Sequence, residues 1–310
     1  MMIQEIRDIP EKARLCYSKN RNIQLPERVP YIGMGSSYFA PLVMKYLGCD
    51  IIPEIASEYY HYLSGSMNYT SAVLLSQSGY SSETIWNIDS FEQCDAVVND
   101  PESPLAKSGK VNRVIELHAG EEKHSATKTY INTLVTLYLG LGLDCVQAIT
   151  TIKQNMKKYE DWGEQRAGII HKKLKSDRIK GIYVIGSGPN LATACQAALI
   201  LTETTKIPFI PMALPQYDHG PKESSDGTIV IPILTDGPVR ERSEKLVKKI
   251  SNAGATVLSW KENNVPEKLS PLTSIIPVNY LAYALSVKLK IGKTFTVGGK
   301  VTIVDKDQKD

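Results

Sequence analysis

Short apolar segments alternate with helix-length segments along most of the chain, and this alternation restricts its fold more than any other feature. The apolar segments are often β-branched and end near Gly, Ser, Asp or Pro, as buried strands do. They cover residues 31–34, 72–77, 95–98, 113–117, 182–185, 228–234 and 256–259. The helix-length segments cover 37–47, 81–92, 125–147, 188–205, 238–253 and 278–290. Such alternation predicts an α/β fold with parallel sheets covered by helices on both faces.

The two halves of the chain contain similar loops. The sequence GMG at 33–35 follows a predicted strand and precedes a predicted helix, and GSG at 186–188 does the same about half a chain length later. A tandem duplication gives such an offset, although any two α/β units resemble each other to this extent. We expect an N-terminal domain over 1–150 and a C-terminal domain over 151–310, each with a parallel sheet of about five strands. The charged segment 149–175 would be a connecting helix, and the last residues a solvated tail.

The composition excludes two classes of protein. The 36 Lys and Arg residues nearly balance the 33 Asp and Glu residues, leaving a net charge of +3 and no basic stripe for nucleic acid. The hydrophobic fraction of 42% and the charged fraction of 22% are typical of a packed chain rather than a disordered one. We therefore expect a globular protein that does not bind nucleic acid.

The sequence also predicts a cytoplasmic protein without a membrane contact. The most apolar run, 130–143, contains Asn132 and is followed by Asp144, so it is too short and too polar to cross a bilayer and should be a buried helix. The N-terminus lacks the apolar region of a secretory signal. The five cysteines are widely spaced without a CxxC motif, which favours reduced thiols over disulfides or a zinc site.

The segment SQSGYSSET at 76–84 follows a predicted strand and opens a predicted helix. Gly79 allows the backbone to approach a ligand closely, and the first amides of a helix are unpaired donors at the positive end of its dipole. A phosphate fits such a turn, with serine hydroxyls as further donors. A serine-rich helix cap is the other interpretation. Five Ser or Thr residues among nine, at the end of a strand, favour phosphate binding.

A second loop, GMGSS at 33–37, has the same position between strand and helix. It lacks the third glycine and the acidic residue of the dinucleotide fingerprint, so we do not expect a nicotinamide site. Two serine-rich turns on neighbouring strands would instead converge at the crevice where α/β sheets bind ligands. The sequence therefore predicts a phosphate site at this edge and no cofactor.

Several motifs follow one another in a characteristic order over about residues 30–304. They are GMGSSY at 33–38, EIASEY at 54–59, SQSGYS at 76–81, ATKTY at 126–130, ALILTE at 198–203, HGP at 219–221 and KVT at 300–302. With this set the chain resembles the sugar isomerase (SIS) domain proteins. It is most similar to the isomerase half of glucosamine-6-phosphate synthase and to the glutaminase-free archaeal glucosamine-6-phosphate deaminases. The resemblance implies two tandem SIS domains of flavodoxin-like fold that bind a phosphorylated sugar.

The resemblance also implies roles for individual positions. The expected phosphate and substrate contacts in the two loops are Gly35, Ser36, Ser37, Ser76, Gln77, Ser78 and Ser81. Glu203 falls on the glutamate that moves a proton between C1 and C2 of the sugar. His219 falls on the ring-opening histidine, which in the family comes from the neighbouring subunit. Lys300 falls on the C-terminal lysine that contacts the sugar, and Glu121 on an acidic residue near that lysine. We therefore expect a homodimer whose site lies between the two domains and near the partner subunit.

These roles suit the residue types. Aldose–ketose interconversion needs one base that removes a proton from carbon and returns it to the neighbouring carbon, and a carboxylate with a raised pKa in a partly dry cleft can do this. Histidine exchanges protons near neutral pH, as ring opening requires. No metal is needed, and the other histidines have no metal-ligand spacing. We expect neither a metal nor a cofactor.

Some positions depart from the family. Ile200 stands where the synthase has a lysine one helical turn before the glutamate, and His124 replaces a small apolar residue. About 30 residues precede the first predicted strand, so we expect no glutaminase domain. Three interpretations remain. The first is an isomerase that interconverts glucosamine 6-phosphate with fructose 6-phosphate and free ammonia. The second is a fructosamine-6-phosphate deglycase, which tolerates loss of the lysine. The third is a phosphosugar-binding protein without catalysis.

Overall fold

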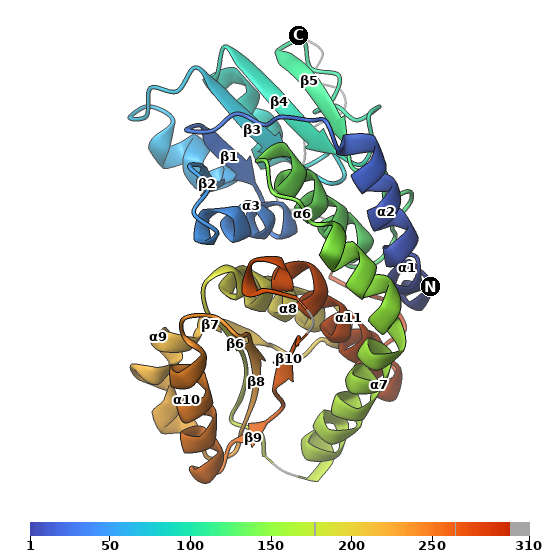
Figure 1. The fold of residues 1–310 in the computed structure, drawn as a ribbon, viewed down its shortest axis with the longest axis vertical. Coiled ribbons are helices and arrows are strands. Elements are labelled where there is room, and N and C mark those ends of the chain that lie inside the picture. The colour runs from blue at the N-terminus through green and yellow to red at the C-terminus, as the bar shows by residue number, and fades with distance from the viewer. Residues whose placement is uncertain (177, 264, 298–310) are drawn as a thin grey trace. The chain divides into compact units, whose positions relative to one another are not determined.

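The computed structural model describes residues 1–176, 178–263 and 265–297 (Figure 1). These residues divide into two compact units, each assembled from separate stretches of the chain. The N-unit consists of Lys12–Glu121, Lys128–Asp144 and the described residues from Thr296 onward. The C-unit consists of Met1–Glu11, Glu122–Thr127 and Cys145–Phe295. The predicted domain boundary after residue 150 falls inside helix α7 (Val146–Ser176) and stays a prediction.

The N-unit contains a five-stranded parallel sheet in the order β2-β1-β3-β4-β5. The strands are β1 (Pro30–Gly33), β2 (Ile52–Ile55), β3 (Ser71–Leu75), β4 (Gln93–Val98) and β5 (Val111–Glu116). The helical elements are α2 (Ile9–Asn20, shared with the C-unit), α3 (Ser36–Tyr46), α4 (Ala56–Glu58), the π-helical turn η1 (Tyr59–Leu63), α5 (Ser82–Trp86), η2 (Asn87–Ser90) and α6 (Lys128–Gly140).

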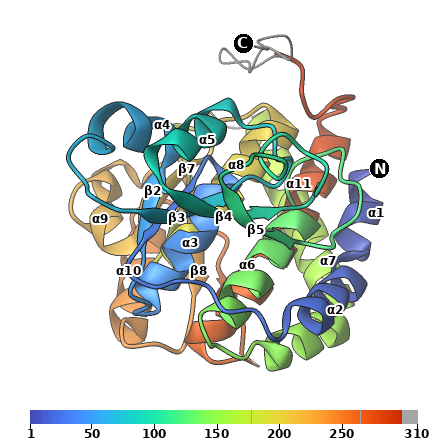
Figure 2. The same ribbon diagram turned by 90° about the horizontal axis from the view of Figure 1, so that it is seen from above.

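Helices cover both faces of this sheet. On one face Ile32, Leu74 and Ala96 pack with Tyr59 of η1 and with Phe91, which follows η2. Figure 2 shows α4 and α5 on this side of the strands and α3 and α6 on the other. The run 130–143 lies largely within α6, where it is buried as its composition predicts.

The C-unit has the same arrangement, but the strands at one side of its sheet are short. Its parallel sheet has the order β7-β6-β8, with β9 and β10 both pairing with β8. The strands are β6 (Gly181–Gly186), β7 (Ile210–Ala213), β8 (Thr228–Leu234), β9 (Thr256–Val257) and β10 (Trp260–Lys261). The helical elements are α1 (Met2–Arg7), α7, α8 (Pro189–Thr205), α9 (Leu214–Asp218), η3 (Pro221–Ser224), α10 (Arg240–Asn252), η4 (Glu267–Leu269) and α11 (Ser270–Lys288). Both sheets therefore have the predicted five parallel strands.

The core of the C-unit also has two layers of helices. Ile185 and Val230 of the sheet pack with Tyr217 of α9 and with Leu246 and Ile250 of α10. Helices α8 and α11 pack together, and α8 also contacts β6 and β7, while α7 lies along α11 (Figure 1). None of the helices in the described ranges is long and apolar enough to cross a membrane.

Corresponding glycines mark the internal repeat. At the end of β1, a Cβ on Gly33 would lie 2.7 Å from the carbonyl oxygen of Ser37, and at the end of β6 a Cβ on Gly186 would lie 2.1 Å from that of Asn190. Gly35 and Gly188 then cap α3 and α8 with nearly the same backbone angles, φ 52 and ψ −122 against φ 54 and ψ −133. Both loops need glycine for the same two reasons, which supports the predicted duplication.

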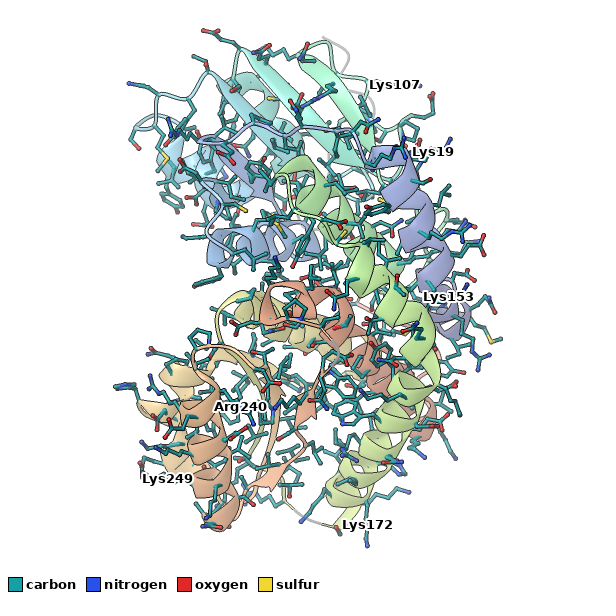
Figure 3. All side chains as sticks on the ribbon, viewed as in Figure 1. Lys19, Lys107, Lys153, Lys172, Arg240 and Lys249 are labelled. Atoms are coloured by element: carbon teal, nitrogen blue, oxygen red, sulfur yellow. The ribbon has the colours of Figure 1, made fainter. Side chains whose placement is uncertain are left out.

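Basic side chains are dispersed over both units. Figure 3 labels exposed residues on α2, α7, α10 and one loop of the N-unit; they are Lys19, Lys107, Lys153, Lys172, Arg240 and Lys249. Several have acidic neighbours: Lys107 pairs with Glu102 at 2.6 Å, and Arg240 pairs with Asp236 and Glu244, each at 2.9 Å. Exposed pairs of this kind add little stability, but they balance the surface charge locally.

Candidate functional site

The serine-rich loop of the N-unit leaves β3 at its carboxyl end. The Ser76 hydroxyl accepts a hydrogen bond of 3.0 Å from the backbone amide of Gly79, and the Ser78 hydroxyl accepts one of 3.2 Å from the amide of Tyr80. Gly79 has a φ of +72, and a Cβ there would lie 1.9 Å from the hydroxyl oxygen of Ser103. The loop is therefore a tight turn that only glycine permits at this position.

The GMGSS loop follows the neighbouring strand β1, which pairs with β3. Ser36 and Ser37 lie in the first turn of α3 and are 9% and 6% exposed. Neither hydroxyl has a hydrogen-bond partner within the part of the chain that the structure describes. Since the strands are parallel neighbours, the sheet brings the two serine-rich loops to the same edge, as the sequence predicts.

The other predicted contact residues are Gln77, Ser81 and Glu121, and they differ in how they are held. Gln77 Nε2 lies 3.5 Å from the hydroxyl oxygen of Thr133 on α6, at the limit of a hydrogen bond. Ser81 is the N-cap residue of α5. Glu121 is exposed at the end of the segment after β5. The structure thus brings the two serine-rich loops to one end of the sheet, with Glu121 outside these turns, and their binding of an anion stays a prediction.

Glu203 lies near the C-terminal end of α8 in the C-unit and is half-buried. Burial raises the pKa of its carboxyl above the usual range, while the hydroxyl of Ser125 and the ammonium of Lys206 act against this by favouring the charged form. No other group within the described ranges hydrogen-bonds to the buried Ser125 hydroxyl, so its proton is available to this carboxyl. A carboxyl poised in this way can both take up and release a proton.

The segment 122–127, which carries Ser125, is held beside α8. Gln196 of α8 donates a hydrogen bond of 3.0 Å from Nε2 to the carbonyl of Ala126. Within the segment, Glu122 Oε1 accepts bonds from the backbone amide of Thr127 at 3.0 Å and from its hydroxyl at 2.7 Å. The position of Ser125 is therefore set by contacts on both sides of it.

Two residues whose contacts sequence reasoning missed, Lys206 and His124, lie at the end of α8. Lys206 caps the helix in the left-handed region, with a φ of 63, and its Nζ donates to the carbonyl of Glu203 at 2.7 Å and to that of Thr294. His124 Nδ1 lies 2.9 Å from the Thr294 hydroxyl. The only signal in the sequence for these contacts was a lysine three residues after Glu203, and where its side chain points depends on the left-handed conformation of the helix cap. Lys206 and His124 thus fasten residue 294 near Glu203.

His219 follows α9 and is exposed, and its backbone amide bonds to the carbonyl of Gln216 at 3.1 Å. The preceding carboxylate, Asp218, accepts hydrogen bonds from Lys222 at 2.9 Å and from Arg242 at 3.2 Å, which fix this turn against α10. The imidazole of His219 is therefore accessible to solvent, or to another subunit, on a turn whose backbone is fixed. Lys300, the remaining predicted catalytic residue, lies outside the described residues.

No group of three or more potential metal ligands gathers within the described ranges. Ile200, which stands in place of the family's lysine, is fully buried in α8. Two cavities of about 440 Å³ lie away from the serine-rich loops, one at the amino ends of the N-unit strands and one beside α10.

The chain was compared with protein families, curated proteins and solved structures, and the last two comparisons give similar proteins. No protein-family model matches the chain. A glutamine–fructose-6-phosphate aminotransferase (isomerizing) of Methanothermobacter thermautotrophicus is 28% identical over 291 residues, which cover 84% of this chain and 49% of the relative. The chain thus spans about half the length of the curated relatives it matches.

Two solved structures share the fold over most of their length. The C-terminal domain of glucosamine-fructose-6-phosphate aminotransferase from Francisella tularensis has a TM-score of 0.73 and 16% identity, with 93% of this chain and 96% of that chain covered. Glucosamine-6-phosphate deaminase from Thermotoga maritima has a TM-score of 0.75 and 19% identity, with 92% and 94% covered. The chain therefore has the double SIS-domain fold that its motifs predict.

Proposed function

We propose that this double SIS-domain chain is a phosphosugar isomerase that interconverts glucosamine 6-phosphate with fructose 6-phosphate and ammonia. The observation that carries the proposal is the half-buried carboxyl of Glu203, whose pKa burial raises and whose ionised form the buried hydroxyl of Ser125 favours. Isomerisation needs a base of this kind. The names of the similar proteins support this choice of substrates, since one is a glutamine–fructose-6-phosphate aminotransferase and another a glucosamine-6-phosphate deaminase.

Each group would perform a distinct step. The serine-rich loops would hold the phosphate, so that binding energy remote from the reacting carbons orients them. His219 would open the sugar ring. Glu203 would then remove the proton from C2 and return it to C1, which leaves an imine at C2. Water hydrolyses this imine to the ketone and releases ammonia, and the reverse sequence forms the amino sugar. Glu121 and Lys300 would contact the sugar, as the resemblance implies.

We propose further that the chain acts as a homodimer in which His219 serves the site of the partner subunit. Its exposure on a turn held by Asp218 supports this assignment, because the imidazole is accessible and its backbone is fixed.

A fructosamine-6-phosphate deglycase is the second candidate. Ile200 favours it, since this buried aliphatic side chain offers no cation where the synthase has lysine. Deglycation uses the same proton transfer in the opposite direction: the proton moves from C1 to C2, and the resulting imine at C1 is hydrolysed to glucose 6-phosphate and an amine.

An assay with glucosamine 6-phosphate that follows ammonia and fructose 6-phosphate in parallel tests the first proposal. Equal amounts of the two products establish the deaminase reaction. If neither forms and fructosamine 6-phosphate instead yields glucose 6-phosphate, the deglycase is correct. Saturable binding of both phosphosugars without turnover of either would leave the non-catalytic interpretation and exclude both enzymes.

A further inference from the structure

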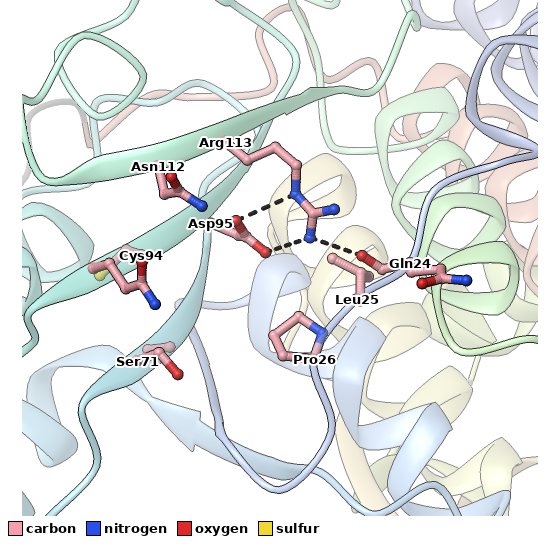
Figure 4. A pocket seen from close by; sticks show the side chains of 10 residues that line it. Gln24, Leu25, Pro26, Ser71, Cys94, Asp95, Asn112 and Arg113 are labelled. Carbon is pink, nitrogen blue, oxygen red and sulfur yellow. Dashed lines mark hydrogen bonds and ion pairs between the residues drawn. The ribbon is translucent and has the colours of Figure 1, made fainter.

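A cavity of about 440 Å³ opens at the amino ends of β3, β4 and β5 in the N-unit. Figure 4 shows that its lining comes from these strands and from the segment before β1. The lining residues are Gln24, Leu25, Pro26, Ser71, Ala72, Gln93, Cys94, Asp95, Asn112 and Arg113. Ser71 begins β3, whereas Ser76 follows its other end, so the cavity lies at the sheet edge opposite the serine-rich loops. It is a separate place from the proposed phosphate site.

The walls of the cavity are held by hydrogen bonds. The Arg113 guanidinium pairs with the 8% exposed Asp95 through Nε at 3.3 Å and Nη2 at 2.6 Å. Nη2 also donates to the carbonyl of Gln24 at 2.7 Å (Figure 4), and the hydroxyl of the buried Tyr31 donates to that of Pro26 at 2.8 Å. The segment 24–26 is thus fastened to the sheet, which is the pre-organisation that a binding site needs.

A β-bulge directs Asn112 toward this cavity. The pairing of β4 with β5 matches Cys94 with Val111 but Asp95 with Arg113, so Asn112 is an extra residue without a partner in the ladder. Bulges occur preferentially next to functional sites, where they redirect a side chain. Asn112 lines the cavity together with Asp95 and Arg113, the ion pair next to the bulge.

Most of the polar side chains that line the cavity make no hydrogen bond with the rest of the described chain. The side chains of Gln24, Gln93, Asn112 and Ser71 make no hydrogen bond within the described part of the chain. Each is neutral and can both donate and accept. The formal charges of the lining, on Asp95 and Arg113, neutralise each other. The cavity therefore suits a neutral ligand with several groups that also donate and accept.

We propose that this cavity binds a neutral polyhydroxylated molecule, a sugar without a phosphate, through the amides of Asn112, Gln93 and Gln24. Sugar hydroxyls both donate and accept, as these amides do, and Leu25, Pro26 and Ala72 supply apolar surface for a ring face. A volume near 440 Å³ is within the range of small-molecule sites. Because the cavity and the serine-rich loops occupy opposite edges of one sheet, the ligand would be an effector rather than the phosphorylated substrate.

Saturation-transfer difference NMR with methyl α-D-glucopyranoside tests the proposal on the full chain. We expect saturable binding with a Kd in the millimolar range, unaffected by a saturating concentration of inorganic phosphate. The double variant Asn112→Ala, Gln93→Ala should weaken binding at least about tenfold. Both side chains are exposed, so the variant should fold, and an unchanged melting temperature would verify this.

Asn22→Ala is the matched control, since Asn22 is an exposed amide close in sequence to Gln24 but is not part of the lining. It should bind the glucoside as the parent protein does. The proposal is overturned if the glucoside shows no saturable signal, if the double variant binds it as well as the control, or if adenosine binds in its place. These results are independent of the phosphosugar assay.

Discussion

The Nε2 of Gln196 donates a hydrogen bond of 3.0 Å to the carbonyl of Ala126. This bond joins α8 to the segment 122–127, whose Ser125 hydroxyl favours the ionised form of the Glu203 carboxyl. The carboxyl and its neighbouring donor are therefore parts of one framework within the C-unit.

Replacing Glu203 with Gln keeps the size of the side chain and removes the base. We expect kcat for the isomerase reaction to fall by about 10²–10⁴, while binding of the phosphosugar is retained. Kinetics and calorimetric titration measure the two quantities separately. Glu223→Gln, in η3 of the same unit, is the control and should leave kcat unchanged. Undiminished turnover in the Glu203 variant would remove this residue from the mechanism.

The raised pKa of Glu203 predicts a pH dependence of both activity and stability. The base must be ionised, so kcat/KM should fall as the pH is lowered through a value above the ordinary glutamate pKa of about 4.3. The folded protein binds this proton more tightly than the unfolded chain does. The ionised carboxyl therefore costs stability above the folded pKa, and the cost disappears below the unfolded pKa.

Thermal unfolding as a function of pH checks the stability part without substrate. Glu203→Gln should melt at a higher temperature than the parent protein at pH 8, and the difference should vanish near pH 4. A difference that stays constant over this range would show that the carboxyl titrates as an exposed one.

The proposed sharing of sites between subunits predicts complementation. His219→Ala and Glu203→Gln proteins should each be inactive in the phosphosugar assay. After subunits are exchanged, a mixed dimer contains one site with both native groups, and part of the activity should return. Activity that does not return, although mixed dimers are detected by mass spectrometry, would place His219 in the site of its own chain.

Gly79→Ala should disturb the serine-rich loop. The substitution forces a side chain into a positive φ and against Ser103, which we expect to cost about 1–3 kcal/mol of stability and to weaken phosphosugar binding. Gly109→Ala is the control, because a Cβ there meets nothing within 4 Å. Denaturant unfolding measures the cost, and equal stability of the two variants would contradict the strained-turn interpretation.

The buried thiols should be unreactive in the folded protein. Burial raises the pKa of Cys16 and of Cys195 to about 11 and that of Cys94 to about 12. At pH 8 the thiolate fraction is then a few hundredfold below that of a free cysteine for Cys16 and Cys195, and on the order of a thousandfold below it for Cys94. Iodoacetamide labelling followed by peptide mass spectrometry should show them protected until the chain is unfolded. Rapid labelling of the fully buried Cys16 would be inconsistent with this.

The strands that could be predicted from the sequence are those with continuous apolar runs. The predicted strand 228–234 matches β8 at both ends, because it is buried on both faces. The edge strands β2 and β7 were missed. Each contains a proline, Pro53 or Pro211, which cannot donate to a ladder and is tolerated at a sheet edge. The sequence pattern alone does not separate such strands from loops.

Helix ends were harder to predict than helices. The predicted helix 125–147 is interrupted after α6, where Gly142 adopts a φ of +75, although the apolar pattern continues through this point. Helix α11 begins at Ser270, eight residues before the predicted start, since Pro277 inside the helix obscured its first turns. Apolar periodicity reports burial and does not report where the backbone changes direction.

The candidate site could be predicted as far as its loops and its glutamate. The serine-rich turns and Glu203 carry motifs, and the sheet brings the turns to one edge. The role of Lys206 could not be predicted, because its contacts depend on a left-handed helix cap and on Thr294, nearly ninety residues away. Tertiary contacts of this kind have no local signature in the sequence.

The way the two units share the chain bears on how a ribosome produces it. Apart from the stretch from Thr296 onward, the N-unit lies between Lys12 and Asp144, so most of this unit can close while synthesis continues. The C-unit begins with α1, whose Arg7 pairs with Glu160 at 3.0 Å and which packs on α11. Helix α1 can therefore complete its packing only after α11 has been synthesised. A premature stop before Ser270 would release most of the N-unit together with an α1 that lacks its packing on α11.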